Sequence, residues 1–149
     1  MSIKPLSNFG STGYANCSQL EIYEYESYDP STGWGCDISD APDNPTKFSD
    51  ETGDYRTIYA SVDDISCPTG FYFIGNWKID RTSCDVDLEG WLYAPSFSAF
   101  AGGNTTADKT PDSVVRRRRW FRIIEDKFEA SAARVGEDAD ESMGEGVSA

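Results

Sequence analysis

The sequence predicts an all-β domain with an antiparallel sheet, and three observations support this fold class. Segments rich in aromatic and β-branched residues recur at 20–26, 55–62, 71–79, 91–94 and 114–124. Stretches rich in Gly, Pro, Asn, Asp and Ser separate these segments, as expected for turns and loops. Aromatic residues make up 13% of the 149 residues, which indicates a folded chain although the hydrophobic content is only 38%.

The N-terminal half begins with a Ser-, Gly- and Asn-rich stretch, residues 1–18, which we expect to be a flexible arm. Residues 20–26 contain strand-forming residues with acids interspersed and predict the first strand. The following turn contains Pro30, which presets φ, and Gly33, which accepts a positive φ. Residues 35–54 have few apolar side chains and predict a long loop.

The rest of the sheet is predicted from four further segments. Residues 55–62 alternate between polar and apolar side chains and predict a strand. Residues 71–79 are apolar enough for a central strand, in which Gly75 would form a bulge. A short strand is expected at 91–94, a loop at 95–113 and a last strand at 114–124.

These elements predict one β domain over residues 19–125, with parts at about 19–80 and 85–123. Residues 126–135 are compatible with a short C-terminal helix or a linker. Residues 136–149 are acidic and nearly without apolar side chains, so we expect a disordered tail. The first ten residues lack an apolar segment, so we expect no secretory signal.

Composition excludes several functions. The net charge is −13, which opposes general binding to nucleic acids. The chain has no histidine and no Gly-rich phosphate loop, so common catalytic and cofactor sites are missing. The four cysteines form no Cys-x-x-Cys pair, so we expect no zinc site, and reduced thiols are favoured over disulfides. We therefore expect a protein that is not an enzyme and needs neither a cofactor nor a metal.

The most distinctive segment is the arginine run Arg116–Arg119, which lies between Val114-Val115 and Trp120-Phe121. As a strand, it would place Arg116, Arg118, Trp120 and Arg122 on one face and Arg117, Arg119, Phe121 and Ile123 on the other. The run could form a basic surface patch, or its guanidinium groups could stack between aromatic rings. The apolar flanks favour stacking.

A second segment imitates the beginning of a calcium-binding loop. Asp85, Asp87 and Glu89 alternate before Gly90, but the twelfth position of such a loop would be Ser96 rather than glutamate. The sequence therefore favours an acidic turn that precedes a strand.

The order of several motifs resembles the dysferlin (DysF, peroxin/ferlin) domain. Four motifs of this chain resemble the N-terminal part of that domain: Glu21-Ile22-Tyr23-Glu24, Asp29-Pro30-x-Thr32-Gly33-Trp34, Phe48-Ser49-Asp50-Glu51-x-Gly53 and Trp77-Lys78-Ile79-Asp80. Two further motifs resemble its C-terminal part: Asp87-x-Glu89-Gly90-Trp91-x-Tyr93-Ala94 and Val115-Arg116-Arg117-Arg118-Arg119-Trp120-Phe121-Arg122. The resemblance covers about residues 20–123 and indicates a small stand-alone domain of this kind.

The resemblance implies an elongated antiparallel β structure in which Arg and Trp side chains interleave. The expected stack consists of Trp77, Trp91, Tyr93, Arg116, Arg117, Arg118, Arg119, Trp120 and Arg122. The chain departs from the family where tryptophan is frequent, with Phe48 and with Phe71-Tyr72-Phe73. Cation–π contacts at those positions should be weaker.

The resemblance also implies membrane-related work, because the family occurs in ferlins, in peroxins that control peroxisome number, and in autophagy proteins. We expect a cytoplasmic, non-enzymatic binding module that associates peripherally with a peroxisomal, endoplasmic-reticulum or other endomembrane. Its partner would be a lipid headgroup or a membrane protein. The alternative is a soluble interaction scaffold that does not contact lipid, which the net charge favours.

Loop aromatics are the candidates for contact with a membrane or partner, because strand aromatics are needed inside the sheet. Two loops qualify, one with Trp34 and one with Phe97 and Phe100. Alternatively, these rings fold back and cap the ends of the β core.

Overall fold

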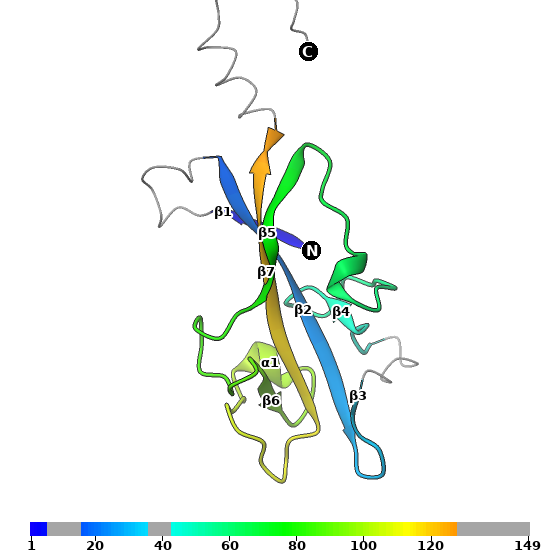
Figure 1. The fold of residues 1–149 in the computed structure, drawn as a ribbon. Coiled ribbons are helices and arrows are strands. Elements are labelled where there is room, and N and C mark those ends of the chain that lie inside the picture. Colours follow the sequence, from blue (N-terminus) through cyan, green and yellow to red (C-terminus); the bar gives the residue numbers. More distant parts are fainter. Residues whose placement is uncertain (6–15, 36–42, 128–149) are drawn as a thin grey trace, which may run out of the picture.

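The computed structural model describes residues 1–5, 16–35 and 43–127, and two long strands dominate it. Strand β2 (Cys17–Asp29) and strand β7 (Val115–Asp126) pair antiparallel from Cys17 opposite Glu125 to Ser27 opposite Val115. Both are rich in the aromatic and β-branched residues that fit a pleated surface. Figure 1 shows this pair as a twisted ribbon that runs along the domain.

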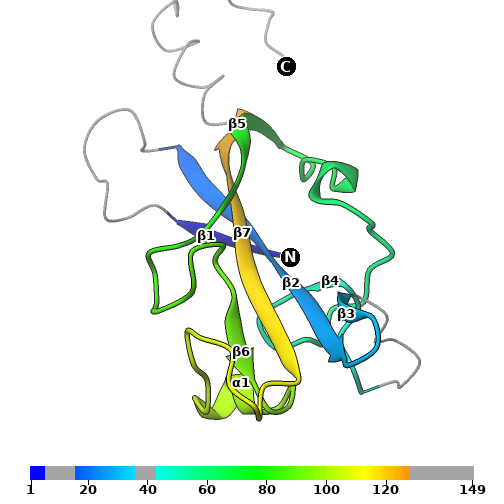
Figure 2. The same ribbon diagram turned by 60° about the horizontal axis from the view of Figure 1, so that its bottom comes forward.

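Shorter strands extend this pair on both sides. The order of the main path is β1 (Ser2–Pro5), β2, β7 and β5 (Phe71–Ile79). Strands β3 (Gly33–Gly35) and β4 (Phe48–Ser49) pair with β2, whereas β6 (Leu92–Ala94) pairs with β7. Figure 2 shows β6 beside the short helix α1 (Ala99–Gly102), at the end of the ribbon away from β5. The seven strands confirm the predicted antiparallel all-β class.

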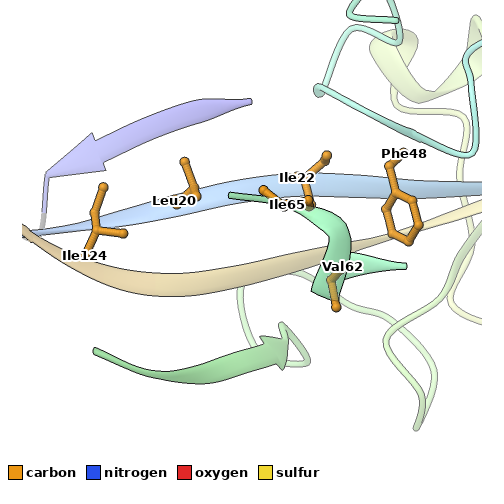
Figure 3. Packing of buried hydrophobic residues seen from close by; sticks show 6 residues of the cluster. All are labelled: Leu20, Ile22, Phe48, Val62, Ile65 and Ile124. Carbon is orange, nitrogen blue, oxygen red and sulfur yellow. The ribbon is translucent and has the colours of Figure 1, made fainter. Parts of the chain in front are cut away.

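The β2–β7 pair is covered on opposite faces at its two ends. Because side chains alternate along a strand, Leu20 and Ile22 lie on one face and Tyr25 lies on the other. The first face packs against the loops that follow β3, in a cluster of Leu20, Ile22, Phe48, Val62, Ile65 and Ile124 (Figure 3). The second face packs near α1, in a cluster of Tyr25, Ala94, Phe100 and Val115. This double coverage explains why β2 lacks a simple alternation of buried and exposed residues.

Most predicted strands are present. Residues 71–79 form β5, and residues 20–26, 91–94 and 114–124 fall within or overlap β2, β6 and β7. The bulge at Gly75 is confirmed, because the register between β5 and β7 shifts between Ile74 and Lys78 and Gly75 has φ 76°.

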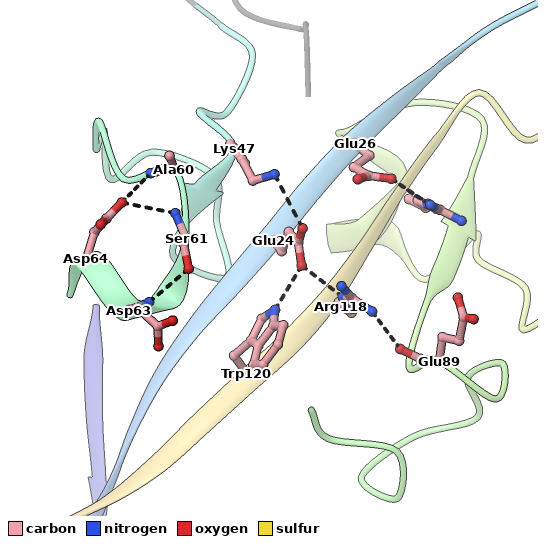
Figure 4. A network of polar contacts seen from close by, with 11 residues as sticks. Glu24, Glu26, Lys47, Ala60, Ser61, Asp63, Asp64, Glu89, Arg118 and Trp120 are labelled. Carbon is pink, nitrogen blue, oxygen red and sulfur yellow. Dashed lines mark hydrogen bonds and ion pairs between the residues drawn. The ribbon is translucent and has the colours of Figure 1, made fainter. Parts of the chain in front are cut away.

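The predicted strand at 55–62 is wrong. Side chains hold this segment instead of a backbone ladder: Ser49 Oγ donates to the Tyr55 carbonyl and Thr57 Oγ1 donates to the Phe48 carbonyl. The segment then enters a single 3₁₀ turn, η2 (Val62–Asp64), which Ser61 and Asp64 cap reciprocally (Figure 4). The strand of this region is β4, which lies earlier in the chain, inside the predicted loop 35–54. Its residue Phe48 is buried in the core.

The predicted arm 1–18 also needs correction. Its first residues form β1, which pairs from Ser2 opposite Glu21 to Pro5 opposite Ser18, and Met1 packs against the first core cluster. Residues 2–5 form a strand because they pair with the edge of β2, a partner that their composition does not indicate. The predicted loop 95–113 contains the short helix α1.

At the other end, β7 continues to Asp126, beyond the predicted strand end. Apart from Asp126 and Lys127, the helix or linker expected over 126–135 and the tail 136–149 lie outside the described residues. Cys36 also lies outside them, and Cys17, Cys67 and Cys84 are free thiols.

Candidate functional site

The register between β2 and β7 places glutamates opposite arginines. Glu26 pairs with Arg116 and Glu24 pairs with Arg118, so these four side chains share one face. The Arg116 Nη2–Glu26 Oε1 distance is 2.6 Å, and the Arg118 Nε–Glu24 Oε1 distance is 2.8 Å. These charge-assisted hydrogen bonds fix the positions of both guanidinium groups.

On this face the arginines alternate with tryptophans in what we call the arginine–tryptophan ladder: Trp34, Arg116, Trp91, Arg118 and Trp120. The Arg116 guanidinium lies 4.5 Å from the ring of Trp34 and 3.9 Å from that of Trp91. The Arg118 guanidinium lies 4.3 Å from Trp91 and 5.2 Å from Trp120. Trp91 therefore stacks between two cations, an arrangement worth about 0.5–2 kcal/mol for each pair.

Glu24 connects the ladder to the core. Its Oε1 accepts hydrogen bonds from Arg118 Nε and from Trp120 Nε1 at 2.8 Å each, and Lys47 Nζ lies 3.7 Å from Oε2 (Figure 4). Glu24 is only 5% exposed, so its charge needs these partners. Arg118 also donates to the carbonyl of Glu89, at the turn before Trp91.

The acidic turn before β6 positions Trp91, which confirms the turn interpretation. Asp87 Oδ1 accepts hydrogen bonds from the backbone N–H groups of Glu89 and Trp91, and Asp87 Oδ2 accepts the Tyr93 hydroxyl at 2.7 Å. Gly90 has φ 88°, and a Cβ atom there would collide with the Ile79 side chain. Only glycine therefore fits this approach of the turn to β5.

The opposite face holds Arg119 in an ion-pair network. Its Nε lies 2.6 Å from Glu21 Oε1, its Nη1 lies 2.9 Å from Asp80 Oδ2, and its Nη2 donates to Gln19. Burial alone would lower the pKa of Arg119, but the two carboxylates outweigh burial and raise this pKa. Burial alone would raise the pKa of Asp80, but hydrogen bonds from residues 82–83 and from Arg119 hold it at about 2.

Arg117, on the same face, has a different environment. Its guanidinium lies 4.6 Å from the ring of Tyr23 and 4.6 Å from that of Phe100. Its Nη1 donates to the Glu51 carbonyl at 2.7 Å and to the Tyr25 hydroxyl at 3.4 Å. Burial raises the pKa of Tyr25 to about 12, although Arg117 acts in the opposite direction.

All four arginines of the run lie in β7, and Arg116 and Arg118 stack on predicted rings, those of Trp91 and Trp120. Arg117 and Arg119 also have rings in stacking reach, but these belong to residues outside the predicted stack. Within the described ranges, two members of the predicted stack, Trp77 and Tyr93, do not stack on an arginine as expected. Among the described residues, Trp77 stacks on no arginine; Phe73 takes the Arg122 guanidinium at 3.7 Å instead. Tyr93 contacts Arg116 through its hydroxyl oxygen, at 3.5 Å, rather than through its ring face.

Several partners of the arginines were not predicted as such from the sequence: Glu21, Glu24, Glu26, Tyr23, Phe73, Phe100 and Phe121. The alternation of Tyr and Glu over 23–26 was the available signal, because it gives successive arginines of the paired strand a tyrosine or a glutamate in turn.

The three candidate contact rings are covered to different degrees, and burial contradicts the contact role for Phe100. Phe100 is 8% exposed and stacks on Arg117, so it belongs to the core. Phe97 is half-buried against Tyr25, with ring centroids 6.0 Å apart. Trp34 is half-buried in the ladder and lies 5.2 Å from the ring of Tyr28. Phe100 therefore caps the core, whereas Phe97 and Trp34 pack against it and keep part of their surface exposed.

Two apolar side chains protrude where no contact residue was predicted. Ile58 is 99% exposed in the loop before η2, and Leu88 is 91% exposed in the acidic turn before β6. Single exposed apolar residues are common, but these two are the most exposed large ones among the described residues.

The helices in the described ranges are too short or too polar to cross a bilayer. No protein-family model matches this chain, and no curated protein matches it either.

Proposed function

We propose that this chain is a non-enzymatic binding module of the dysferlin-domain type, which joins an endomembrane or peroxisomal surface by docking to a membrane protein. The observation that carries this proposal is the arginine–tryptophan ladder. Trp34, Trp91 and Trp120 come from three separate motifs of the family resemblance, yet they meet around Arg116 and Arg118. Interleaving of this kind is what the resemblance implies.

A structural role for the arginines supports a binding module over a polyanion-binding protein. Arg116, Arg118 and Arg119 already contact carboxylates at 2.6–2.9 Å. Their charges are therefore largely compensated within the sheet, and the net charge of the whole chain is −13. Phosphate-rich nucleic acid would meet repulsion over most of the surface.

A protein partner is favoured over a lipid headgroup. Insertion into a bilayer would need exposed rings, but Phe100 is buried and Trp34 and Phe97 are half-buried. Leu88 is exposed but is flanked by Asp87 and Glu89, which an anionic leaflet would repel. An apolar side chain with an acidic rim instead suits a basic protein surface.

The second candidate function is a soluble interaction scaffold, which the net charge of −13 favours. Flotation separates the candidates. The protein is mixed with protein-free vesicles of neutral and anionic composition and with organelle membranes, before and after mild protease treatment of those membranes. We expect flotation only with untreated organelle membranes.

Each other outcome rejects the main proposal. Flotation with protein-free vesicles would assign a lipid headgroup, and absence of flotation with all membranes would assign the soluble scaffold. Leu88→Ser and Ile58→Ser are single surface variants whose melting curves should equal that of the native protein. Loss of flotation in one of them would locate the docking surface.

A further inference from the structure

Arg117 is the arginine of the run whose charge lacks a carboxylate partner. Within the described ranges, Arg116, Arg118 and Arg119 each form an ion pair, whereas no carboxylate oxygen lies within 4.0 Å of the Arg117 guanidinium. Arg117 and Arg119 both face tyrosines in the paired strand, but Arg119 reaches Glu21 on the diagonal and also Asp80. The diagonal neighbours of Arg117 on the paired strand are Tyr23 and Ser27, which carry no carboxylate. A half-buried guanidinium in this position attracts an anion.

One edge of this guanidinium is available. Both hydrogen bonds of Arg117 use Nη1, and Nε and Nη2 donate to no described residue. Neither nitrogen is among the fully buried side-chain atoms that lack a hydrogen bond in the described part of the chain, which are Glu21 Oε2 and Trp77 Nε1. The Nε–Nη2 edge is the fork that matches the two oxygens of a carboxylate.

Arg117 forms part of the wall of two hollows. The first, of about 310 Å³, is lined by Tyr23, Leu92, Val86 and Arg119 among others, and the second, of about 470 Å³, is lined by Phe97, Phe100 and Pro45 among others. Arg117 and Glu51 are the two residues that line both. The first volume lies near the lower end of the range for small-ligand sites.

Charge distinguishes the two hollows. Arg117, Arg118 and Arg119 line the first hollow together with Glu51 and Asp80. Arg118 is paired with Glu24, and Arg119 is paired with Glu21 and Asp80, so among the described residues Arg117 is the uncompensated cation of this hollow and Glu51 is its unpaired acid. In the second, Arg117 is the lining cation and the carboxylates of Asp43 and Glu51 oppose an anion. The first hollow is therefore the better anion site.

We propose that the hollow between Arg117, Tyr23 and Leu92 binds a carboxylate that is attached to a small apolar group. The Nε–Nη2 edge of Arg117 takes the carboxylate, and Leu92, Val86 and the Tyr23 ring contact the apolar group. Two stacked rings and two hydrogen bonds already fix the guanidinium, so binding orders little further. A phosphate dianion is disfavoured because Glu51 and Asp80 repel the second charge.

Titration calorimetry with benzoate tests this proposal, with benzamide as the neutral isostere and phenyl phosphate as the alternative anion. We expect saturable binding of benzoate, no binding of benzamide and weaker binding of phenyl phosphate. Arg117→Lys keeps the charge but removes the fork, and it should weaken benzoate binding at least tenfold. Glu51→Gln removes a repelling carboxylate and should tighten binding about threefold.

Arg122→Lys is the matched control. Arg122 also stacks on a ring and donates to a backbone carbonyl, that of Gly75, without a carboxylate partner among the described residues. It lines neither of the two hollows, so its variant should bind benzoate within twofold of the native protein. Circular dichroism melting verifies that each variant is folded.

Four results would overturn the proposal: no saturable benzoate binding by the native protein, equal loss in both lysine variants, tighter binding of phenyl phosphate, or no tightening in Glu51→Gln. If Arg117→Lys does not fold, the effect of Glu51→Gln on benzoate binding tests the proposal instead. An acetylated Gly-Phe dipeptide, as free acid and as amide, identifies the source of the carboxylate. If the dipeptide acid binds more tightly than benzoate, the ligand of the site is a peptide C-terminus. If benzoate binds more tightly, the ligand is a small free acid.

Discussion

Trp91 is the residue whose removal should damage the fold most clearly. Its side chain is 2% exposed, and the guanidinium groups of Arg116 and Arg118 stack on it at 3.9 Å and 4.3 Å. Trp91→Ala removes a buried ring and both stacking contacts, so it should lower the free energy of unfolding by about 3–5 kcal/mol. That loss is a large part of the stability of a domain of this size.

Trp91→Leu separates stacking from burial. Leucine restores most of the apolar contact but has no ring face, so we expect a loss of about 2 kcal/mol, or about 1 kcal/mol for each cation–π pair. A double-mutant cycle with Arg118→Gln should give a coupling energy of about 1 kcal/mol. Urea unfolding followed by far-ultraviolet circular dichroism measures all of these changes without depending on tryptophan emission.

Trp77→Leu is the matched control for this series. Trp77 is half-buried, packs edge-on against Phe73 and stacks on no arginine among the described residues. Its indole N–H is also buried without a hydrogen-bond acceptor, so its replacement removes an unsatisfied donor. Trp77→Leu should therefore cost less than Trp91→Leu. A loss below about 1 kcal/mol for Trp91→Ala, or equal losses for the two leucine variants, would refute the ladder as the main stabilising feature.

Three other predictions concern stability. Phe100→Ser should lower the Tm because it exposes the second core cluster and removes a ring from Arg117, whereas an unchanged Tm would return Phe100 to the list of surface contacts. Folding lowers the pKa of Asp80 from 3.8 to about 2, so its contribution of about 2 kcal/mol is complete above pH 4 and disappears as the pH falls toward 2. Urea midpoints of the native protein and Asp80→Asn should converge over that range, and a constant difference would contradict this assignment. Removal of residues 136–149 should leave the Tm unchanged because the segment is acidic and almost without apolar side chains, and a fall above about 5 °C would disprove it.

Local chemistry in the sequence was sufficient for several features. The apolar residues on both sides of the arginine run predicted a strand with arginines on both faces, and β7 has this arrangement. Gly75 marked the bulge and the Asp87–Gly90 stretch marked the turn before β6, because glycine and aspartate act through backbone geometry close to their own positions.

Features that depend on distant partners were decided by the tertiary structure. Residues 55–62 alternate like a strand, but the hydroxyl groups of Ser49 and Thr57 bind the backbone there, so no ladder forms. Ser2–Pro5 have little strand character in their composition, yet the open edge of β2 recruits them. The sequence left Trp34 as either a contact ring or a cap on the core, and the β2–β3 hairpin places it over Arg116.

The register between β2 and β7 is the clearest case. The sequence contained Glu21, Glu24 and Glu26 on one strand and four arginines on the other, but many pairings were compatible with both patterns. The observed register gives carboxylates to Arg116, Arg118 and Arg119 and leaves Arg117 between aromatic rings. A shift by one residue would move every side chain of one strand to the other face. The sequence therefore determined which groups the sheet contains, whereas packing of the whole domain fixed the register and with it the arginine that stays available to a ligand.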